Sequence, residues 1–343
     1  MIVDDSMVAR AVLSRMVEAD GGFEIAAVAG TAEDSIEALA HVKVDVVLLD
    51  LEMPGAGGLR MLPQIIAAAR GARIIVVSSL AEEGAEETVA ALAMGAADTL
   101  PKPGIGRFNG RFSEILLAKL GALGNASEAP GGAVVPQAPV VPLRAMSNAP
   151  LAALAVGAST GGIHSLGLFF KALPEPLSAP ILVTQHLPVP FMDVFARQLA
   201  TASNRQAILA KDGLELVPER IHIAPGDAHL TVEQRGGRVV VRLDRRRAAS
   251  GCLPSVDPML ASVGEVYGAG ACGVLLSGMG RDGVDGAARV VARGGSILAQ
   301  DEATSAVWGM PRAVAEAGLA CAILPPDKIA RRVASRAGDC AWK

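Results

Sequence analysis

The strongest constraint on the fold is a glycine-rich turn near the middle of the chain. An apolar run of strand length begins at Leu151 and leads into Gly-Ala-Ser-Thr-Gly-Gly at residues 157–162, and an apolar-periodic helical segment follows from Ile163 to Leu173. Open α/β folds place their chemistry where such a strand ends, beside the backbone N–H groups of the next helix. Ser159, which lies within this turn, is therefore the first candidate nucleophile.

The turn also permits other interpretations. Residues 157–161 fit the G-x-S-x-G pattern of hydrolase nucleophile elbows, but a serine in a tight turn can simply cap the next helix. Dinucleotide binding fits less well. Ser159 stands at the second glycine of G-x-G-x-x-G, and no acidic residue ends the next strand about twenty residues on, where a ribose partner is expected.

Length and charge restrict the class of protein. A chain of 343 residues is long enough for two domains, each with its own core. The formal net charge of −4 argues against a nucleic-acid binder, and the basic run from Arg245 to Arg247 is typical of a solvated loop. No apolar segment reaches the roughly 18 residues of a membrane helix, and no basic n-region follows Met1. We therefore expect a cytoplasmic protein without direct membrane insertion.

The cysteines are widely spaced. Cys252, Cys272, Cys321 and Cys340 form neither a C-x-x-C motif nor a Cys/His cluster in the sequence. In a cytoplasmic protein this spacing favours reduced, mostly structural thiols, and it predicts no zinc site.

The first hundred residues alternate between short β-like runs and helical segments, which is typical of a doubly wound parallel sheet. The expected strands are residues 23–28, 44–49, 73–77 and 97–100, after a first strand that ends at the acidic pair. The expected helices are residues 7–17, 32–41, 59–69 and 86–94.

Charged and polar residues collect where these strands end. Asp4 and Asp5 close the first strand, Asp50 closes the third, Ser78 and Ser79 close the fourth, and Lys102 follows the fifth. Three carboxylates at one sheet edge repel one another unless a hard cation such as Mg²⁺ neutralises them. A nearby lysine would then contact a phosphoryl oxygen. Taken singly, each residue could instead serve a turn or the surface.

These strand ends, with Met53-Pro54 and Pro101-Lys102-Pro103 beside them, resemble a response-regulator receiver domain. The resemblance implies that Asp50 is the phosphoacceptor. It also implies that Ser78 is a switch hydroxyl and that Lys102 contacts the phosphate. A sensor histidine kinase would be the phosphodonor.

The same resemblance implies a Mg²⁺ site that serves receiver phosphorylation. Its ligands would be Asp5, Asp50 and the carbonyl of Glu52, with Asp4 in the same acidic pocket. Two features depart from the family pattern: only three residues precede the acidic pair, and Gly57 stands where many receivers have aspartate. Either the start site is set too late or the first strand is short, and a short first strand would weaken the sheet that positions Asp4 and Asp5.

The periodicity fades after the fifth strand. Residues 111–120 could make one short helix, but residues 121–148 are rich in Ala, Pro, Gly and Val, which is typical of an extended tether. We therefore expect a receiver domain at residues 1–104, a linker at 105–148 and a second α/β domain with a mostly parallel sheet at 149–343.

Two other residues of the second domain follow the carboxyl end of a predicted strand, as Ser159 does. His186 follows the apolar strand from Ile181 to Gln185, and Asp282 lies in a glycine-rich loop after the strand from Cys272 to Ser277. If these strands are parallel neighbours, a nucleophile, a base and an orienting carboxylate meet at one sheet edge.

Each residue also has a plainer interpretation. His186 could be a hydrogen-bonded structural histidine, and Asp282 could cap a helix. The order Ser, His, Asp differs from the Ser, Asp, His order of α/β-hydrolases, and no histidine follows His229, so that fold matches poorly.

Five motifs of this domain, taken together, resemble the protein-glutamate methylesterase family of bacterial chemotaxis. They are Gly157-Ala-Ser-Thr-Gly-Gly162, Gln185-His186, Pro254-Ser-Val-Asp257, Leu276-Ser-Gly-Met-Gly-Arg-Asp-Gly283 and Gly309-Met-Pro-Arg312. The resemblance implies Ser159 as nucleophile, His186 as base and Asp282 as orienting carboxylate. It places Thr160 and Met279 at the active site, Met279 with a backbone N–H for the oxyanion.

The sequence therefore predicts a phosphorylation-regulated hydrolase of glutamyl methyl esters on chemoreceptors, which would also deamidate receptor glutamines. No cofactor is expected for ester hydrolysis itself. The alternative keeps the receiver but makes the second domain a non-catalytic interaction module. A DNA-binding output is disfavoured, since the second domain is too long and too rich in strands for a helix-turn-helix.

Overall fold

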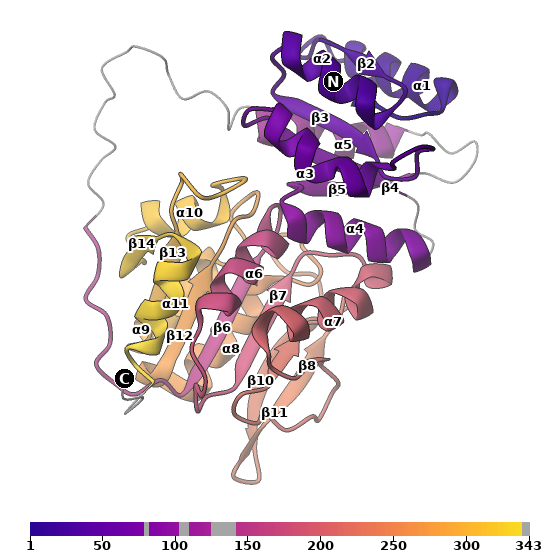
Figure 1. Ribbon diagram of the computed structural model, residues 1–343. Helices are drawn as coiled ribbons and strands as arrows, with labels where there is room; N and C mark the ends of the chain where they lie inside the picture. The colour runs from indigo at the N-terminus through magenta and orange to yellow at the C-terminus, as the bar shows by residue number, and fades with distance from the viewer. Residues whose placement is uncertain (79–81, 103–109, 125–141, 338–343) are drawn as a thin grey trace. The chain divides into compact units, whose positions relative to one another are not determined.

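The computed structural model describes residues 1–78, 82–102, 110–124 and 142–337 (Figure 1). The chain divides into two units, Met1–Val135 and Pro136–Lys343, each of which is described here by itself. Ser79, Pro103, Cys340 and much of the expected linker lie outside the described residues. Within the described part, every helix is too short or too polar to cross a membrane.

The first unit contains a parallel sheet in the order β2-β1-β3-β4-β5. Its strands are β1 (Ile2–Val3), β2 (Val28–Ala29), β3 (Val46–Asp50), β4 (Arg73–Ser78) and β5 (Asp98–Pro101). All neighbouring pairs are parallel. The predicted doubly wound architecture is confirmed, and the carboxyl ends of β1 and β3 meet at one edge.

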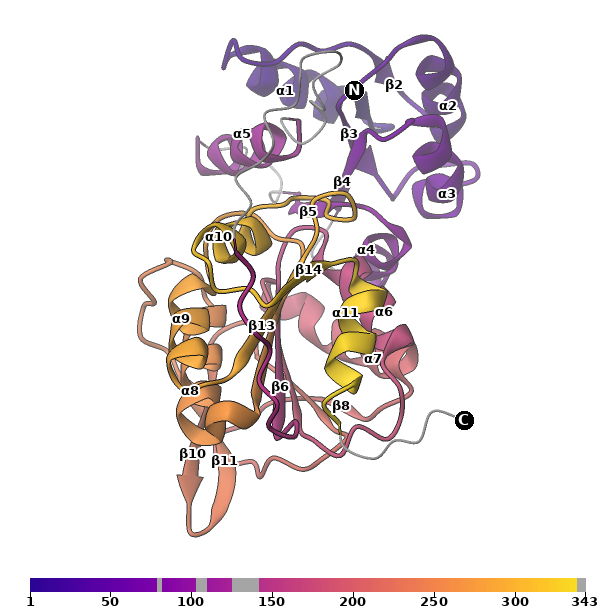
Figure 2. The same ribbon diagram turned by 90° about the vertical axis from the view of Figure 1, so that its left-hand side faces the viewer.

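Helices cover both faces of this sheet (Figure 2). They are α1 (Met7–Glu18), α2 (Ala32–His41), α3 (Gly58–Ala68), α4 (Glu82–Met94) and α5 (Gly110–Gly124). α1 packs with α5, while α3 packs with both α2 and α4. The first two helices begin where their sequences predict, because Ser6 and Thr31 accept hydrogen bonds from the backbone N–H groups of Ala9 and Asp34.

The second strand is much shorter than its sequence predicts. The expectation of a strand over residues 23–28 is wrong, since only Val28 and Ala29 pair with the sheet. An edge strand can extend only as far as its neighbour, and β1 has just two residues. β1 is nevertheless central and buried, and the amino group of Met1 donates to the carbonyl of Val46 at 2.8 Å.

Parts of the expected linker pack against the units. α5 is longer than the predicted helix of residues 111–120, and its Leu116 and Leu123 are fully buried.

At the carboxyl end of the expected linker, the backbone N–H of Arg144 donates to the carbonyl of Ala320 at 3.0 Å. Ser147 bonds both Ser296 and the carbonyl of Ala269. These contacts belong to the second unit.

The second unit is built on a parallel sheet in the order β14-β13-β12-β6-β7-β9-β8. Its strands are β6 (Ala153–Ala158), β7 (Ile181–Gln185), β8 (Ala207–Leu209), β9 (Ile221–Ile223), β12 (Ala271–Leu275), β13 (Ser296–Gln300) and β14 (Ala322–Leu324). A separate antiparallel hairpin joins β10 (His229–Arg235) to β11 (Arg238–Asp244). The expected mostly parallel sheet is confirmed.

Helices lie on both faces of this second sheet as well (Figure 2). They are α6 (Gly162–Ala172), α7 (Met192–Ser203), α8 (Val256–Tyr267), α9 (Val284–Ala292), α10 (Met310–Glu316) and α11 (Pro326–Ala334), with 3₁₀ turns at Val189–Phe191 and Gly268–Gly270. α6 packs with α7 and α11, and α9 packs with α8 and α10. Strands covered on both faces are expected to be mostly apolar, and every residue of β6, β7 and β12 is buried.

Helix α8 fixes the position of the loop that precedes it, which ends at Ser255. Its Val256, Met259, Leu260 and Val263 are fully buried and pack into the core of the sheet. Each such side chain stabilises the fold by about 1.5–3 kcal/mol. The first turn of α8 is therefore held rigidly against the strands.

Candidate active site and acidic pocket

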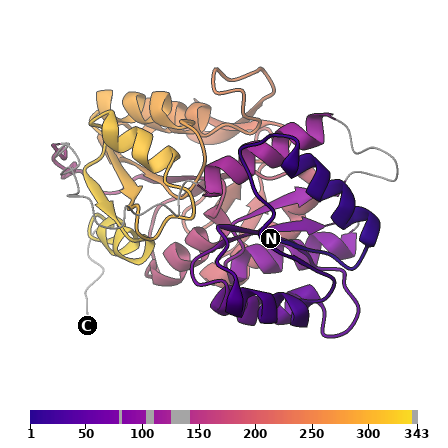
Figure 3. The ribbon, with the colours of Figure 1, turned by 90° about the horizontal axis from the view of Figure 1, so that it is seen from above.

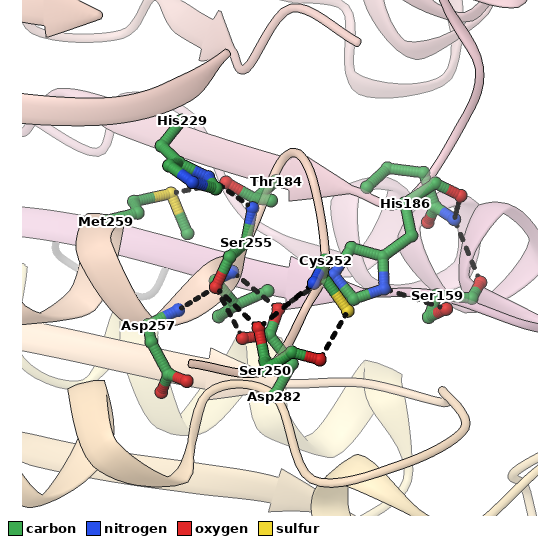
Figure 4. Close-up of polar contacts among 12 residues, drawn as sticks. Ser159, Thr184, His186, His229, Ser250, Cys252, Ser255, Asp257, Met259 and Asp282 are labelled. Carbon is green, nitrogen blue, oxygen red and sulfur yellow. Dashed lines mark hydrogen bonds and ion pairs between the residues drawn. The ribbon is translucent and has the colours of Figure 1, made fainter. Parts of the chain in front are cut away.

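Three parallel neighbours carry the predicted site residues at their carboxyl ends. β12, β6 and β7 are adjacent, with Gly157 in register with both Leu275 and Thr184. Ser159 follows β6, His186 follows β7, and Asp282 lies in the loop between β12 and α9. The condition on which the sequence prediction depended is met, and the three side chains converge (Figure 4).

The turn that holds Ser159 is tied to the strands beside it. The backbone N–H of Ser159 donates to the carbonyl of Ser277 at 3.0 Å. Gly161 has a φ of +74°, and a Cβ there would stand 2.3 Å from the Cβ of Ala306. A Cβ on Gly278 would stand 2.8 Å from the Cβ of Ser159. Glycine at both positions lets the two loops close around the serine.

His186 bridges the serine and the aspartate. Its Nδ1 lies 3.1 Å from Ser159 Oγ, and its Nε2 lies 2.8 Å from Asp282 Oδ2. An ionised carboxylate can only accept, so Nε2 carries the proton and Nδ1 is left to accept the serine proton. The imidazole is mostly shielded, with 17% of its side chain exposed, against 2% for Asp282. This is the arrangement of a nucleophile, its base and an orienting carboxylate.

The Asp282 carboxylate is fully hydrogen-bonded. Besides His186, Oδ1 accepts from Ser255 Oγ at 2.6 Å and Oδ2 accepts from the backbone N–H of Val256 at 2.7 Å. Burial by itself raises the pKa of the Asp282 carboxyl, but these three donors outweigh it and hold that pKa well below its usual range. Asp282 therefore stays ionised at neutral pH.

The same environment changes the basicity of His186. Burial alone lowers the pKa of the imidazole, whereas the bond to Asp282 and the nearby Cys252 raise it, and the result is a pKa of about 9. An imidazole with this pKa is a strong base once it has lost its proton. The pH at which it becomes neutral then controls nucleophile activation.

Ser255 and His229 are supporting residues that the sequence did not predict. The backbone N–H of Ser255 donates to His229 Nδ1 at 2.8 Å, and His229 Nε2 bonds the carbonyl of Arg246 at 2.7 Å. His229 thus fixes the residue that in turn fixes Asp282 (Figure 4). Ser255 stands in the motif Pro254-Ser-Val-Asp257, which gave it no separate role, and the structure shows that it also caps α8.

The backbones of Thr160 and Met279 lie next to the catalytic turn. The carbonyl of Thr160 accepts from Ser277 Oγ at 2.7 Å. Met279 follows Gly278, which abuts Ser159, and its side chain is 42% exposed. Among the described residues its backbone N–H has no hydrogen-bond partner. The structure thus leaves this N–H available to a ligand, without assigning it one.

A second polar edge lies in the first unit. Asp50 ends β3, and its Oδ2 is 2.5 Å from Lys102 Nζ, which is also 3.5 Å from Asp4 Oδ2. Asp4 and Asp50 are almost fully buried. Burial raises the pKa of Asp50 above its usual value, although Lys102 and the backbone N–H of Glu52 oppose that rise.

The chemistry of this acidic pocket fits a hard divalent cation. One oxygen from each of Asp4, Asp5 and Asp50 lies within 4.8 Å of the others. Asp4 Oδ2 is buried and makes no hydrogen bond in the described part of the chain, although Lys102 stands 3.5 Å away. A buried carboxylate oxygen in this state is costly, and Mg²⁺ would remove that cost. Glu52 is the fourth predicted ligand, through its carbonyl. Its backbone N–H donates to Asp50 Oδ1 at 3.0 Å.

The hydroxyl of Ser78 is engaged by helix α4. Its Oγ lies 2.5 Å from Thr88 Oγ1, and Thr88 in turn donates to the carbonyl of Gly84. The backbone carbonyl of Ser78 accepts from the N–H of Lys102 at 2.7 Å, which ties β4 to the residue that pairs with Asp50.

Comparison with known proteins covers both units. Residues 154–333 match the family model described as CheB methylesterase, and residues 1–107 match the response regulator receiver domain. A protein-glutamate methylesterase/protein-glutamine glutaminase 2 of Caulobacter vibrioides is 42% identical over 99% of both chains. A protein-glutamate methylesterase/protein-glutamine glutaminase of Azospirillum brasilense is 38% identical over 98% of this chain and 93% of its own.

A solved structure gives the same result for the second unit. The CheB methylesterase catalytic domain of Thermotoga maritima is 37% identical, with a TM-score of 0.53, and the match covers 54% of this chain and 98% of that one.

Proposed function

Since the chain belongs to the CheB methylesterase family and also carries a response regulator receiver domain, we propose that it hydrolyses glutamyl methyl esters on chemoreceptors under control of receiver phosphorylation. The observation that carries the proposal is the Ser159–His186–Asp282 chain of hydrogen bonds at one sheet edge. Its relatives' names add glutamine deamidation, and we extend that activity to this chain because amides and esters react through similar tetrahedral intermediates.

The first half of the reaction forms an acyl-enzyme. Ser159 Oγ attacks the ester carbonyl while its proton passes to Nδ1 of His186, and ionised Asp282 stabilises the imidazolium. The tetrahedral intermediate places negative charge on the former carbonyl oxygen, for which the backbone N–H of Met279 is the proposed donor. The intermediate collapses as Nδ1–H returns the proton to the leaving methoxy group, and methanol departs.

The second half restores the enzyme. Nδ1 of His186 takes a proton from water as the water oxygen attacks the acyl carbonyl. The tetrahedral intermediate collapses as Nδ1–H returns that proton to Ser159 Oγ, and the glutamic acid product leaves and ionises. Ester hydrolysis uses only side chains and backbone of the second unit, so no cofactor is proposed for it.

Control resides in the first unit. We propose Asp50 as the phosphoacceptor, with a sensor histidine kinase as donor and Lys102 as the partner of the transferred phosphoryl group. Asp4, Asp5, Asp50 and the carbonyl of Glu52 would hold Mg²⁺, which neutralises charge during phosphoryl transfer. Rotation of Ser78 away from Thr88 would couple the phosphoryl group to α4. Phosphorylation would then shift the population toward an arrangement with an open active site.

The proposal is tested by methanol release from methyl-labelled receptor membranes in the presence of Mg²⁺ and a small phosphodonor. Wild type should release methanol, and Ser159→Ala should lose about 10⁴-fold or more, the usual cost of removing a nucleophile. Ser335→Ala is the matched control, because that exposed hydroxyl bonds only its own helix at Arg332.

Three results would count against the proposal. Methanol release by Ser159→Ala at the wild-type rate would remove the nucleophile assignment. Equal wild-type rates with and without the phosphodonor would remove the regulatory part. Absence of release by wild type from several receptor preparations would favour the non-catalytic interaction module.

A further inference from the structure

A cysteine lies beside the catalytic base, although the two are far apart in the sequence. Cys252 occupies the loop between β11 and α8 and is half-buried. Its Sγ, a ring nitrogen of His186 and a carboxylate oxygen of Asp282 all lie within 4.8 Å of one another. Figure 4 shows the three side chains approaching from three separate segments. The cluster therefore offers one sulfur, one nitrogen and one oxygen ligand to a common point.

We propose that Cys252, His186 and Asp282 form an inhibitory Zn²⁺ site that overlaps the catalytic residues. Zinc binds such S, N and O donors in tetrahedral geometry, and three protein ligands leave the fourth position to water. Mg²⁺ is a hard cation that prefers oxygen, so the Mg²⁺ of the acidic pocket does not compete for a thiolate site. The inference rests on the proposed function, because it describes regulation of the same active site.

The existing contacts require only small movements to admit the metal. His186 Nε2 and Asp282 Oδ2 are 2.8 Å apart as hydrogen-bond partners, and they would separate slightly as both turn toward the ion. Cys252 Sγ donates to the carbonyl of Ser250 at 3.9 Å and lies beside the His186 ring, whose pKa it raises. Gly251, immediately before it, has a φ of +74° and open space around its Cα. The loop can therefore adjust without disturbing the core.

Proton accounting explains why binding would inhibit. Zinc takes Cys252 as thiolate, so the Sγ proton goes to solvent. It displaces the proton of Nε2 to solvent, and the remaining ring proton stays on Nδ1. Nδ1 then donates to Ser159 instead of accepting from it, and the serine loses its base. The thiolate and the Asp282 carboxylate together balance the charge of the ion, which keeps the buried site neutral.

The metal site is tested directly by Co²⁺ binding to the full-length protein, followed by its absorption spectrum. A thiolate ligand gives a near-ultraviolet charge-transfer band that oxygen and nitrogen ligands do not give. The band should form in wild type and in the control Cys321→Ser, which removes another half-buried thiol, and it should be lost in Cys252→Ser. Absence of the band in wild type, or its persistence in Cys252→Ser, would overturn the proposal. This readout does not depend on any esterase activity.

A Zn²⁺ titration of methanol release tests the inhibition. Each variant is compared with its own metal-free rate, and a zinc-selective chelator should restore activity. The half-inhibiting Zn²⁺ concentration should rise at least about ten-fold in Cys252→Ser, because losing even an outer-shell partner commonly costs about 10–100-fold in metal affinity. An unchanged value would show that zinc acts elsewhere, for example at Asp4, Asp5 and Asp50, and would overturn the inference while leaving the esterase proposal intact.

Discussion

Both units contain strands with helices beside them (Figure 3). Each places a buried carboxylate at the carboxyl edge of its parallel sheet, but the two sites satisfy these carboxylates in opposite ways. In the acidic pocket, Asp4 Oδ2 makes no hydrogen bond with the residues that the structure describes, and Lys102 faces both Asp4 and Asp50. At the catalytic edge, Asp282 accepts hydrogen bonds from His186, Ser255 and Val256. Accordingly, the pKa of Asp50 is raised and the pKa of Asp282 is lowered.

Because of this difference, the same α/β architecture can serve two chemistries. The acidic pocket is short of positive charge and hydrogen-bond donors, so it is suited to receive a cation and a phosphoryl group from outside. The catalytic edge is complete without an added ion, so its groups are already oriented for proton transfer. Variants at each edge would show whether the acidic pocket needs an added cation and whether the catalytic edge does not.

The largest effect should come from neutralising the satisfied carboxylate. Asp282→Asn replaces an acceptor with an amide that can donate to Nε2, which leaves the proton on Nδ1 and the wrong tautomer facing Ser159. We expect kcat for ester hydrolysis to fall about 10⁴-fold. Asp285→Asn, an exposed acid in the first turn of α9, is the control. A near wild-type kcat for Asp282→Asn would show that Asp282 does not fix the tautomer.

The pH dependence of hydrolysis should follow His186. Its pKa is raised to about 9, so at neutral pH most of the imidazole is protonated and cannot accept the serine proton. Consequently, kcat/KM should increase about ten-fold per pH unit below that pKa and level off above it. A small neutral ester is the right substrate, because it does not itself titrate. A flat profile between about pH 6 and 9 would contradict the raised pKa.

A smaller loss should follow from removing one donor to Asp282. Ser255→Ala leaves Oδ1 without its 2.6 Å bond, so the pKa of Asp282 should rise and its hold on His186 should weaken. We expect a loss of about 10–100-fold in kcat, the usual value of a hydrogen bond to a charged group, with little change in KM.

The control for Ser255→Ala is Ser262→Ala on the same helix, whose hydroxyl bonds Met259 and Val232 instead. The rising limb of the pH profile should also move to lower pH in Ser255→Ala, because a weaker hold by Asp282 lowers the pKa of His186. An unmoved limb with reduced activity would mean that the change is merely structural.

The smallest effect concerns the acidic pocket. Calorimetric titration of the full chain with Mg²⁺ should show binding that Asp4→Asn weakens by about ten-fold or more, since that variant removes a buried ligand charge. Asp45→Asn, at the opposite end of β3, should bind as wild type does. Because the pKa of Asp50 is raised, protons should compete with the metal as the pH falls. Equal affinity in both variants would show that Asp4 is not a ligand.

The strand ends could be predicted from the sequence because their signals are local. Apolar runs that end in polar residues mark the carboxyl edges of buried parallel strands, and β6, β7 and β12 prove to be neighbours as that pattern required. Edge strand β2 could not be predicted in the same way. Its length depends on how far β1 extends beside it, and not on the apolar character of residues 23–28.

The supporting contacts could not be predicted either. No role for Ser255 within its motif followed from the sequence, nothing singled out His229, and Cys252 was too far from any histidine to suggest a metal site. Ser255 and Cys252 come close to Asp282 because the loop before α8 is anchored by that helix in the core, and His229 is held to Ser255 from β10. Likewise, the turn of Ser78 toward Thr88 depends on where α4 packs.

Local patterns were enough to predict the two α/β sheets and the residues at their carboxyl edges, because strand length, burial and termination are properties of short segments. Three features depended on the packed fold: which nitrogen of His186 faces Ser159, how completely Asp282 is hydrogen-bonded, and the presence of a thiol beside the base. Hydrogen bonding and metal ligation depend on differences of less than an ångström between segments distant in the chain. Core packing sets those differences, and no local pattern encodes them.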